Sequence, residues 1–425
     1  MAIPWLPESA PKTANSEDRT CPLIETLELL PQIRQRFGIT RIGDTTELDR
    51  IGIPTFCAVV PDSADAISVY NGKGPTRDHA MCSAIMEAVE RQCGAYAELA
   101  TIRLRPREVS PDIGFSGLGM LESVYDQEVD FVEGLDVLSE QRVLVPFAAV
   151  KSPWHGERIF LMSSSNGLAS GNNLLEAVYH ALMEYIERHG WAIAHTRAHV
   201  RPRLVLEALA RGIGERIDVS QMVDDPAVDR VPFPTGDNLL DDLYERIRRA
   251  GLDLRLVAQE DSNLPTVMMA SINEESTEPV MSHFGLGASW SPRQAALRAI
   301  TEAAQTRSVD IQGAREDLLR PGETSEAFGH HGRRRTVAPS GRWYYDAPIP
   351  CRPYSALSDR SRPCLAAELR DVLEAFRHAG IRRAVVVDIS PRDLPVSVAR
   401  VLVPDLESTL VDGHIGKTIR SIIGA

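Results

Sequence analysis

One acidic phrase occurs three times along this chain and constrains its fold more than any other feature. It reads SAIMEAVER at Ser83 to Arg91, HALMEYIER at His180 to Arg188, and RAITEAAQTR at Arg298 to Arg307. Each copy has an acid, a second acid or amide three residues later, and an arginine close behind. Because residues i and i+3 share one face of an α-helix, the phrase predicts three helices that each present a polar, mostly acidic face.

The paired side chains predict a metal site. They are Glu87 with Glu90, Glu184 with Glu187, and Glu302 with Gln305. Like charges on one helix face cost about a few tenths of a kcal/mol, and three such faces packed together need a counter-charge. Carboxylates without Cys or dedicated His ligands suit a hard cation, and Mg²⁺ that keeps positions for phosphate oxygens fits best. Three helices with exposed Glu/Arg pairs are the alternative, which apolar neighbours such as Ile85, Leu182 and Ile300 disfavour.

Glycine-rich loops precede two of the acidic helices. NGKGPT, from Asn71, places Lys73 between two glycines, and SSSNGLASGNN begins at Ser163. Such loops can hold phosphate with backbone amides, although most are simple turns. Standard nucleotide signatures are absent, since GHIGKT lacks the first Walker glycine and no kinase catalytic loop occurs. The loops therefore indicate a nucleotide site of another design.

Helix and strand patterns alternate over the rest of the chain. The segments 239–272 and 368–403 each predict an amphipathic helix ended by Ala-Gly, a β-branched strand, an acidic turn with Leu-Pro and a second strand. Residues 129–150 alternate around a turn, as a β-hairpin or meander does. Asn173 with Glu176 resembles a helix capping box, and Ser291 with Pro292 marks another helix start. We therefore predict an α/β fold with mixed sheets, internally duplicated helix–strand units and three acidic helices around a common cleft.

The segment 1–36 is predicted to be a loose Pro-, Ser- and Thr-rich lead followed by a short helix, and residues 37–425 to form the main body. The stretch 326–343 breaks the regular pattern with Gly, Pro and the basic cluster at 333–335. It is predicted to be a mobile loop, either a solvated surface segment or a lid for an acidic ligand.

Composition excludes several classes of protein. Acidic residues outnumber basic ones 59 to 46 and give a net charge of -13, which disfavours a nucleic-acid partner. The start lacks a signal-peptide pattern and no apolar run is long enough for a bilayer, so a soluble cytoplasmic protein is expected. Six cysteines without a C-x-x-C motif indicate reduced thiols. His195 and His199 have the spacing of a zinc pair, but no Glu follows directly, so ordinary histidines are expected.

Taken together, these motifs resemble the YcaO superfamily of ATP-dependent enzymes that modify peptide backbones, from about Phe37 to about Glu407. The S-x-x-x-E-x-x-E-R motif is Ser83, Glu87, Glu90 and Arg91, and the S-x-x-N-G element is Ser163, Asn166 and Gly167. The next helix carries Glu176, Glu184, Glu187 and Arg188, and the E-A-A-Q-x-R motif is Glu302, Gln305 and Arg307, followed by Arg315.

The resemblance implies a YcaO-type fold with an ATP cleft and with ATP and Mg²⁺ as cofactors. It implies nucleotide contacts from Lys73, Ser83, Arg91, Ser163, Asn166, Arg188, Gln305 and Arg307. It implies that the metal ligands are Glu87, Glu90, Glu176, Glu184, Glu187 and Glu302. The implied reaction is attack of an amide oxygen on the γ-phosphate, followed by addition of a nucleophile and loss of phosphate. Positioning and charge neutralisation then carry catalysis, and no nucleophilic side chain is required.

The opening segment from Gly38, GITRIGDTTELDRIGIPTFCAVVP, followed by SVYNGKG, looks like the branch that works with a TfuA partner and forms thioamides from sulfide. Azoline-forming members usually end in a proline-rich tail resembling P-x-P-x-P, whereas this chain ends HIGKTIRSIIGA. We therefore expect thioamidation of a precursor peptide or protein, with a TfuA-like partner, a sulfide source and a homodimeric assembly. Cyclodehydration to azolines and a noncatalytic ATP-binding regulatory role are the open alternatives.

Overall fold

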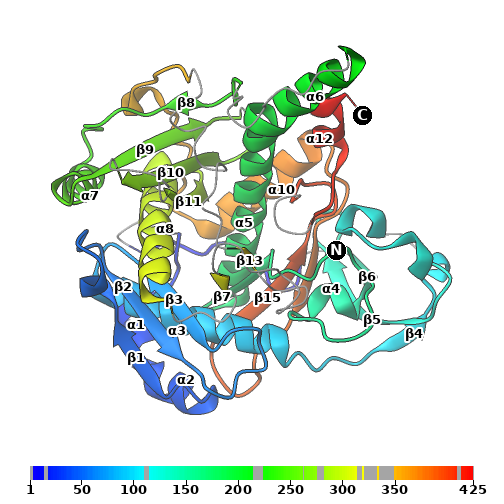
Figure 1. Ribbon diagram of the computed structural model, residues 1–425. Coiled ribbons are helices and arrows are strands. Elements are labelled where there is room, and N and C mark those ends of the chain that lie inside the picture. Colours follow the sequence, from blue (N-terminus) through cyan, green and yellow to red (C-terminus); the bar gives the residue numbers. More distant parts are fainter. Residues whose placement is uncertain are drawn as a thin grey trace.

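The computed structural model describes residues 3–13, 18–109, 114–213, 224–261, 263–274, 282–313, 318–319, 333–334, 349–408 and 413–424. Helices and strands alternate in it and form an α/β structure with several sheets, as the sequence predicts (Figure 1). Of the expected mobile loop 326–343, only residues 333–334 fall within the described residues. Arg315 lies outside them.

The helices differ widely in length, and the three longest carry the acidic phrases. They are α1 (Leu23–Glu28), α2 (Leu30–Arg36), α3 (Arg77–Ala95), α4 (Phe147–Val150), α5 (Leu174–His195), α6 (Arg201–Ile213), α7 (Asn238–Arg249), α8 (Pro292–Gln312), α10 (Leu365–His378) and α12 (Lys417–Ile423). A π-helical turn, η5 (Thr196–Val200), joins α5 to α6. The predicted short N-terminal helix is thus two helices, because α2 begins at Leu30 with a proline in its first turn.

Three larger sheets and one short strand pair organise the strands. The first sheet holds β1 (Arg41–Asp44), β2 (Thr55–Val59) and β3 (Val69–Lys73). The second holds β8 (Asp229–Arg230), β9 (Leu252–Gln259), β10 (Thr266–Glu274) and β11 (Ser282–Ser289). The third holds β4 (Ile102–Leu104), β5 (Val129–Asp136), β6 (Gln141–Pro146), β7 (Leu168–Gly171), β14 (Val385–Asp388) and β15 (Ser397–Leu402). The pair is β12 (Leu318–Leu319) with β13 (Arg333–Arg334).

Neighbouring strands in the larger sheets run antiparallel, and among the described strands only β12 and β13 pair in parallel. The predicted hairpin over 129–150 is confirmed, because β5 and β6 pair with Asp136 opposite Gln141. The three larger sheets are therefore antiparallel among the described strands. The fold is mixed in the sense that helices and strands alternate along the chain.

Both predicted helix–strand units are present. Helix α7 is followed by the antiparallel pair β9 and β10, and α10 is followed by the antiparallel pair β14 and β15. Gly251 and Gly380 adopt φ angles of 70° and 75° just past the two helices. Side chains other than glycine rarely adopt these angles, so the Ala-Gly sequence ends both helices for the same reason.

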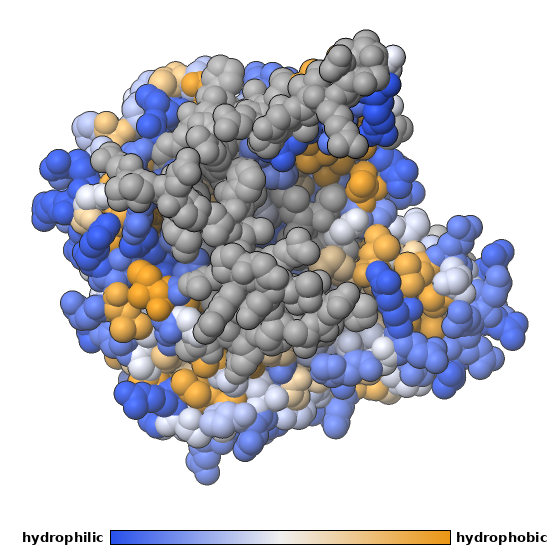
Figure 2. Space-filling model, in the orientation of Figure 1, coloured by the Kyte–Doolittle hydropathy of each residue, from blue (hydrophilic) through white to orange (hydrophobic). Residues whose placement is uncertain are grey.

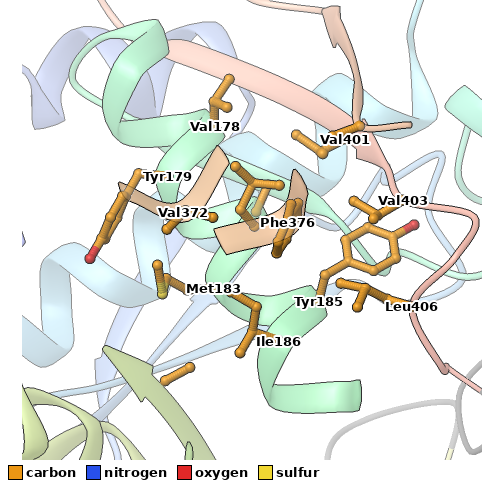
Figure 3. Packing of buried hydrophobic residues seen from close by; sticks show 14 of the residues in the cluster. Val178, Tyr179, Met183, Tyr185, Ile186, Val372, Phe376, Val401, Val403 and Leu406 are labelled. Carbon is orange, nitrogen blue, oxygen red and sulfur yellow. The ribbon is translucent and has the colours of Figure 1, made fainter. Parts of the chain in front are cut away.

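The hydrophobic core has three clusters, and each acidic helix belongs to a different one. Helix α3 packs into a cluster with strands of the first and third sheets, and α8 packs into one with α7, β9 and β10. Helix α5 packs against α10 and the end of β15, where Tyr179, Met183 and Ile186 meet Val372 and Phe376 (Figure 3). Each of the three helices buries its apolar side in its own cluster. Their polar sides are therefore free to face one another.

The N-terminal lead is held against the body rather than loose. Lys12 Nζ lies 2.6 Å from Asp18 Oδ1 and 2.7 Å from Glu368 Oε1, and all three side chains are buried. The backbone bonds of Lys12 with Pro363 and of Leu365 with Ala10 add the lead to the chain next to α10. The Pro-rich composition does not reveal this, because the partners lie about 350 residues away in the sequence.

The face of the molecule drawn in Figure 2 is polar along its edges. On the face in Figure 2, hydrophilic residues dominate the rim, and hydrophobic side chains form separate small patches. Across the residues that the structure describes, no helix combines the length and apolar character that crossing a membrane requires. All six cysteines are free thiols, as expected.

Candidate nucleotide and metal site

Local sequence signals fix where the three acidic helices begin. The Thr76 side chain accepts a bond from the His79 backbone at the start of α3, and Asn173 Oδ1 accepts one from Glu176 N, at 3.0 Å, at the start of α5. Helix α8 begins with Pro292 at its first position, but the Ser291 side chain makes no capping bond. The proline, whose missing N–H costs nothing there, is thus the effective start signal of α8.

Glycines let the helices lie directly on their neighbouring strands. A Cβ on Gly72 of β3 would stand 2.0 Å from the Ala84 backbone nitrogen of α3. A Cβ on Gly285 of β11 would stand 2.3 Å from the Ala299 oxygen and the Ala303 nitrogen of α8. No side chain fits in these contacts, so both helices are held close to their strands, and their acidic residues at fixed positions.

The three helices line one cavity of about 560 Å³. The glutamates that line it are Glu87 and Glu90 of α3, Glu184 and Glu187 of α5, and Glu302 of α8, and Asp18 and Asp310 line it too. The predicted nucleotide contacts that also line it are Lys73, Ser83, Arg91, Arg188 and Gln305. Residues from three separate parts of the sequence thus surround one space of a size that accommodates a small-molecule ligand.

Cations in the cavity balance only part of this acidity. Lys73 Nζ forms an ion pair with Glu302, and Arg188 Nη2 lies 3.7 Å from Glu184 Oε1. Arg91 is turned to a different acid, because its guanidinium donates two bonds, of 2.7 and 2.8 Å, to Asp65. The guanidinium of Arg298 lies 3.9 Å from Glu187 Oε1, farther than the bonds between Arg91 and Asp65.

The electrostatics of the glutamates follow from this imbalance. Burial, reinforced by Glu184 and Glu87, raises the pKa of Glu90 well above its usual range. Burial also raises the pKa of Glu184 to about 7, against the opposing effect of Arg188. Burial raises the pKa of Glu302 too, but Lys73 and Arg188 outweigh it, so the net shift is downward. Bringing a cation into the cavity would stabilise the ionised forms of Glu90 and Glu184.

The donor set fits Mg²⁺ with a polyphosphate. Carboxylate oxygens are the ligands of a hard divalent cation, and Lys73 and Arg188 are suited to phosphate oxygens. Buried polar atoms without a partner among the described residues include Asn71 Nδ2 and Arg188 Nε. Within the same residues, no three His, Cys, Asp or Glu side chains stand close enough together to hold an ion by themselves. An ion here would need further oxygens, as Mg²⁺ bound to phosphate has.

Four predicted site residues are not among those that line the cavity: Ser163, Asn166, Glu176 and Arg307. Ser163 Oγ accepts a bond from Trp154 N at 3.2 Å and borders a separate small hollow. Asn166 is buried, and neither polar atom of its side chain has a partner in the described structure. Its neighbour Ser165 does line the cavity.

Glu176 is fully engaged by the protein itself. Its Oε1 accepts bonds from Thr20 N, Thr20 Oγ1 and Cys21 N, and its Oε2 accepts bonds from Asn172 N and Nδ2, all between 2.7 and 3.2 Å. Burial would raise the pKa of Glu176, but Arg19 and these bonds outweigh it and lower the pKa. The carboxylate thus joins the N-terminal lead to the start of α5.

Arg307 has a similar structural position. Its Nε donates to Asp49 Oδ2 at 2.9 Å and its Nη2 to Glu274 Oε1 at 2.8 Å, and the side chain is buried. These bonds connect α8 to β10 and to the loop after β1. Arg91 and Arg188 follow Glu87 and Glu184 by four residues, whereas Arg307 follows Glu302 by five, so the spacing already placed Arg307 off the shared helix face.

The sequence reading missed several residues of this region. Arg19, His180 and Arg298 line the cavity. Arg400 of β15 is buried, and donates to Ala149 O at 2.9 Å and to Ser164 O at 2.8 Å, which holds the segment that contains Asn166. The only prior signal was that His180 and Arg298 begin two of the repeated phrases; nothing in the sequence indicated Arg19 or Arg400.

Comparison with protein families matches residues 71–407 to the family described as YcaO cyclodehydratase, ATP- and Mg²⁺-binding. An uncharacterized protein of Methanothermobacter thermautotrophicus is 32% identical over 94% of this chain and 98% of its own. An uncharacterized protein in the tfuA 3' region of Rhizobium leguminosarum bv. trifolii is 31% identical over 98% of this chain and 95% of its own.

Among solved structures, YcaO from Methanopyrus kandleri, bound with AMPPCP and Mg²⁺, has the same fold with a TM-score of 0.68. It is 24% identical, and the match covers 94% of this chain and 95% of the other. A heterocyclase in complex with substrate and cofactor matches with a TM-score of 0.69 at 17% identity, over 94% of this chain and 54% of the other. At these identities, the two structures show that the chain has the YcaO fold.

Proposed function

Because the chain belongs to the YcaO family, we propose that it is an ATP-dependent enzyme that converts a backbone amide of a ribosomally made peptide or protein into a thioamide. The observation that carries the proposal is the cavity in which glutamates of α3, α5 and α8 meet Lys73 and Arg188. A structural protein would have no reason to bury carboxylates whose protein partners do not satisfy them.

In the proposed site, the glutamates that line the cavity hold Mg²⁺, which neutralises charge on the triphosphate. Lys73 and Arg188 bind phosphate oxygens, and Gln305, whose amide donates to the Asn71 carbonyl, holds strand β3 against α8. The paired positions of Lys73 with Glu302 and of Arg188 with Glu184 orient both cations before ligand arrives. This preorganisation is what phosphoryl transfer needs, since the transition state requires positioning and charge stabilisation rather than a protein nucleophile.

The proposed reaction has two steps. The amide oxygen attacks the γ-phosphorus of ATP, so that a new O–P bond forms while the bond to ADP breaks. Hydrosulfide then adds to the activated carbon, and the C–O bond breaks to release phosphate. The proton of hydrosulfide ends on the phosphate, and the products are the thioamide, ADP and phosphate.

Two observations favour sulfide as the nucleophile. The Rhizobium relative, which is similar over nearly the whole chain, is described by its position in a tfuA region, and we propose a TfuA-like partner for this chain too. Among the described residues 413–424, none lines the cavity, so that segment offers no group there to activate a substrate side chain.

The test is mass spectrometry of candidate peptides and proteins encoded near the gene, incubated with this protein, its TfuA-like neighbour, Mg-ATP and sulfide. The expected result is a gain equal to the difference between sulfur and oxygen, together with ADP and phosphate. Samples without ATP or without sulfide are the controls. Nucleotide binding without any turnover would support the noncatalytic alternative instead.

Azoline formation is the second candidate, because the family is described as a cyclodehydratase and a matching structure is a heterocyclase. It needs no sulfide and lowers the peptide mass by one water at a Cys, Ser or Thr. The same experiment therefore separates the two reactions directly.

A further inference from the structure

The cavity has two chemically different ends. Cys82 of α3 stands eight residues before Glu90, and Glu176 of α5 stands eight residues before Glu184, about 12 Å along each helix. Arg19 lies close enough to Cys82, Glu176 and His180 to influence the pKa of each. Glu90 and Glu184 in turn influence each other. Helices α3 and α5 thus run in the same direction along the cavity, with Glu90 and Glu184 toward one end and Arg19, beside Glu176, toward the other.

The fold fixes Arg19 at that end. Asp18 is held on one side by Lys12 and by Ser289 Oγ, which donates to Asp18 Oδ2 at 2.9 Å. Thr20 and Cys21 are held on the other side by Glu176 Oε1. The guanidinium of Arg19, 39% exposed, has one ion pair in the described structure, at 3.5 Å to Glu176 Oε2. Because the other bonds already satisfy Glu176, most donors of Arg19 are available to a ligand.

A second guanidinium, that of Arg298, lies between His180 and the glutamates. Arg298 Nη2 is 3.4 Å from His180 Nδ1, and its Nε is 3.9 Å from Glu187 Oε1. His180 is more than nine-tenths buried. Burial, together with Arg19 and Arg298, lowers the pKa of His180 well below its usual range, so the imidazole is neutral at pH 7. The neutral imidazole of His180 therefore adds no positive charge beside Arg19 and Arg298.

The other groups at this end suit sulfur. The thiols of Cys21 and Cys82 line the cavity there, as does the side chain of Leu23. Burial raises the pKa of Cys82 to about 11, so its thiol stays neutral and does not compete with an incoming anion for the guanidinium groups. Two guanidinium groups, whose charge Glu176 and Glu187 balance in part, and two thiols match a soft monoanion, whereas the cluster of Glu90 and Glu184 matches a hard divalent cation.

We propose that Arg19 and Arg298 bind a small anion beside Cys82, and that this anion is the hydrosulfide that attacks the activated amide. The inference rests on the proposed function for the identity of the anion. The N-terminal lead then supplies part of the active site, and Lys12, Asp18 and Glu368 are positioning residues that hold Arg19 at the cavity. The same cationic chemistry could instead receive a carboxylate of the substrate, which the experiment distinguishes.

The experiment uses the full chain and binding measurements alone. Thermal unfolding is recorded under anaerobic conditions with increasing sodium hydrosulfide or sodium acetate, with and without saturating Mg-AMPPCP, whose affinity is measured by calorimetry. Arg19→Ala and Arg298→Ala are compared with Arg36→Ala, which removes a surface arginine paired with Asp393. We expect saturable stabilisation of the wild type by hydrosulfide and a loss of at least about tenfold in hydrosulfide affinity in Arg19→Ala. We expect Arg19→Ala to keep its affinity for Mg-AMPPCP within about twofold of the wild type, and Arg36→Ala to match the wild type in both measurements.

Several results would overturn the inference. An equal hydrosulfide response in Arg19→Ala and wild type would remove Arg19 from the site, and no saturable response in the wild type would remove the site itself. Stabilisation by acetate alone, lost in Arg19→Ala, would assign the site to a substrate carboxylate. If Arg19→Ala does not fold, Arg19→Lys replaces it, and it should bind hydrosulfide more weakly than the wild type because it loses the guanidinium fork. A wild type that cannot bind Mg-AMPPCP contradicts the proposed function, while the titration without nucleotide still decides the anion site.

Discussion

Helix α5 carries two glutamates in different surroundings, Glu176 and Glu184, and their difference separates the framework of the site from its chemistry. Glu176 accepts bonds from Thr20, Cys21 and Asn172, and its pKa is lowered. Two turns further along the same helix, Glu184 has Arg188 at 3.7 Å, and burial raises its pKa to about 7. Glu176 is fully buried and Glu184 is half-buried, and of the two only Glu176 has its ionised form satisfied by the protein.

The comparison extends to the rest of the chain. Glu407 resembles Glu176, because its carboxylate accepts bonds from the backbone of Gly416, Thr418 and Ile419 at the start of α12. Glu90 resembles Glu184, since its pKa is raised well above the usual range. A buried carboxylate that is saturated with N–H donors stabilises the fold, whereas one that is not saturated destabilises it until a cation arrives. Each class therefore predicts a different response to mutation.

The largest expected effect is on turnover in Glu184→Gln. Removing this charge from the proposed metal site should lower ATP turnover about 10²- to 10³-fold, a range typical of losing one group that stabilises transition-state charge. Steady-state release of phosphate measures it, with Glu133→Gln on the exposed face of β5 as the matched control. Glu184→Gln should be at least as stable as the wild type. Undiminished turnover would exclude Glu184 from the metal site.

Glu176→Ala should show the opposite behaviour. It leaves the backbone N–H groups of Thr20, Cys21 and Asn172 without their acceptor, so we expect a loss of about 3 kcal/mol in the free energy of unfolding. Chemical denaturation of both variants compares them directly. Should Glu176→Ala keep wild-type stability and lose Mg-AMPPCP binding, Glu176 would return to the predicted set of metal ligands.

The sequence could predict the parts of the site that depend on local periodicity. The i, i+3 spacing placed the acidic faces of α3, α5 and α8, and the structure brings Glu87, Glu184 and Glu302 to one cavity. The capping signature of Asn173 and Glu176 indicated the start of α5, which the bond from Glu176 N to Asn173 Oδ1 confirms.

Other parts depend on contacts that no local pattern encodes. Arg19 reaches the cavity because Lys12 pairs with Glu368 and Thr20 bonds to Glu176. The partners of the second contact are 156 residues apart in the sequence, and those of the first are farther apart still. Arg400 lies within a strand pattern in which its burial beside Ser164 could not be anticipated. Likewise, the partners of Arg307, Asp49 and Glu274, are known only once α8 is placed.

A pH dependence follows from the unsatisfied class. The pKa of Glu184 is about 7 in the folded state against 4.5 as its ordinary value, so between these values the folded protein binds more protons than the unfolded chain. The free energy of unfolding should therefore fall as pH rises, by about 2 kcal/mol from pH 5 to 6.5 for this group alone. Denaturation curves of wild type and Glu184→Gln should diverge over this range. Parallel curves would show that Glu184 is not the unsatisfied group we take it to be.

The smallest expected effect concerns the end of α12, next to the satisfied Glu407. Deleting residues 422–425 removes the last turn of this helix but keeps Thr418 and Ile419, whose backbone bonds satisfy the Glu407 carboxylate. Helix α12 packs against α5, α6 and η5, and the described part of 413–424 lies outside the cavity lining. We therefore expect a loss of stability below about 1 kcal/mol, as for fraying of a helix end, and turnover within about twofold of the wild type.

Glu407→Gln, which weakens the bonds to α12 without shortening the chain, should cost more stability than the deletion and equally little turnover. A truncated protein that folds but has lost turnover would instead give the C-terminal segment a role in catalysis, and would favour azoline formation over thioamidation.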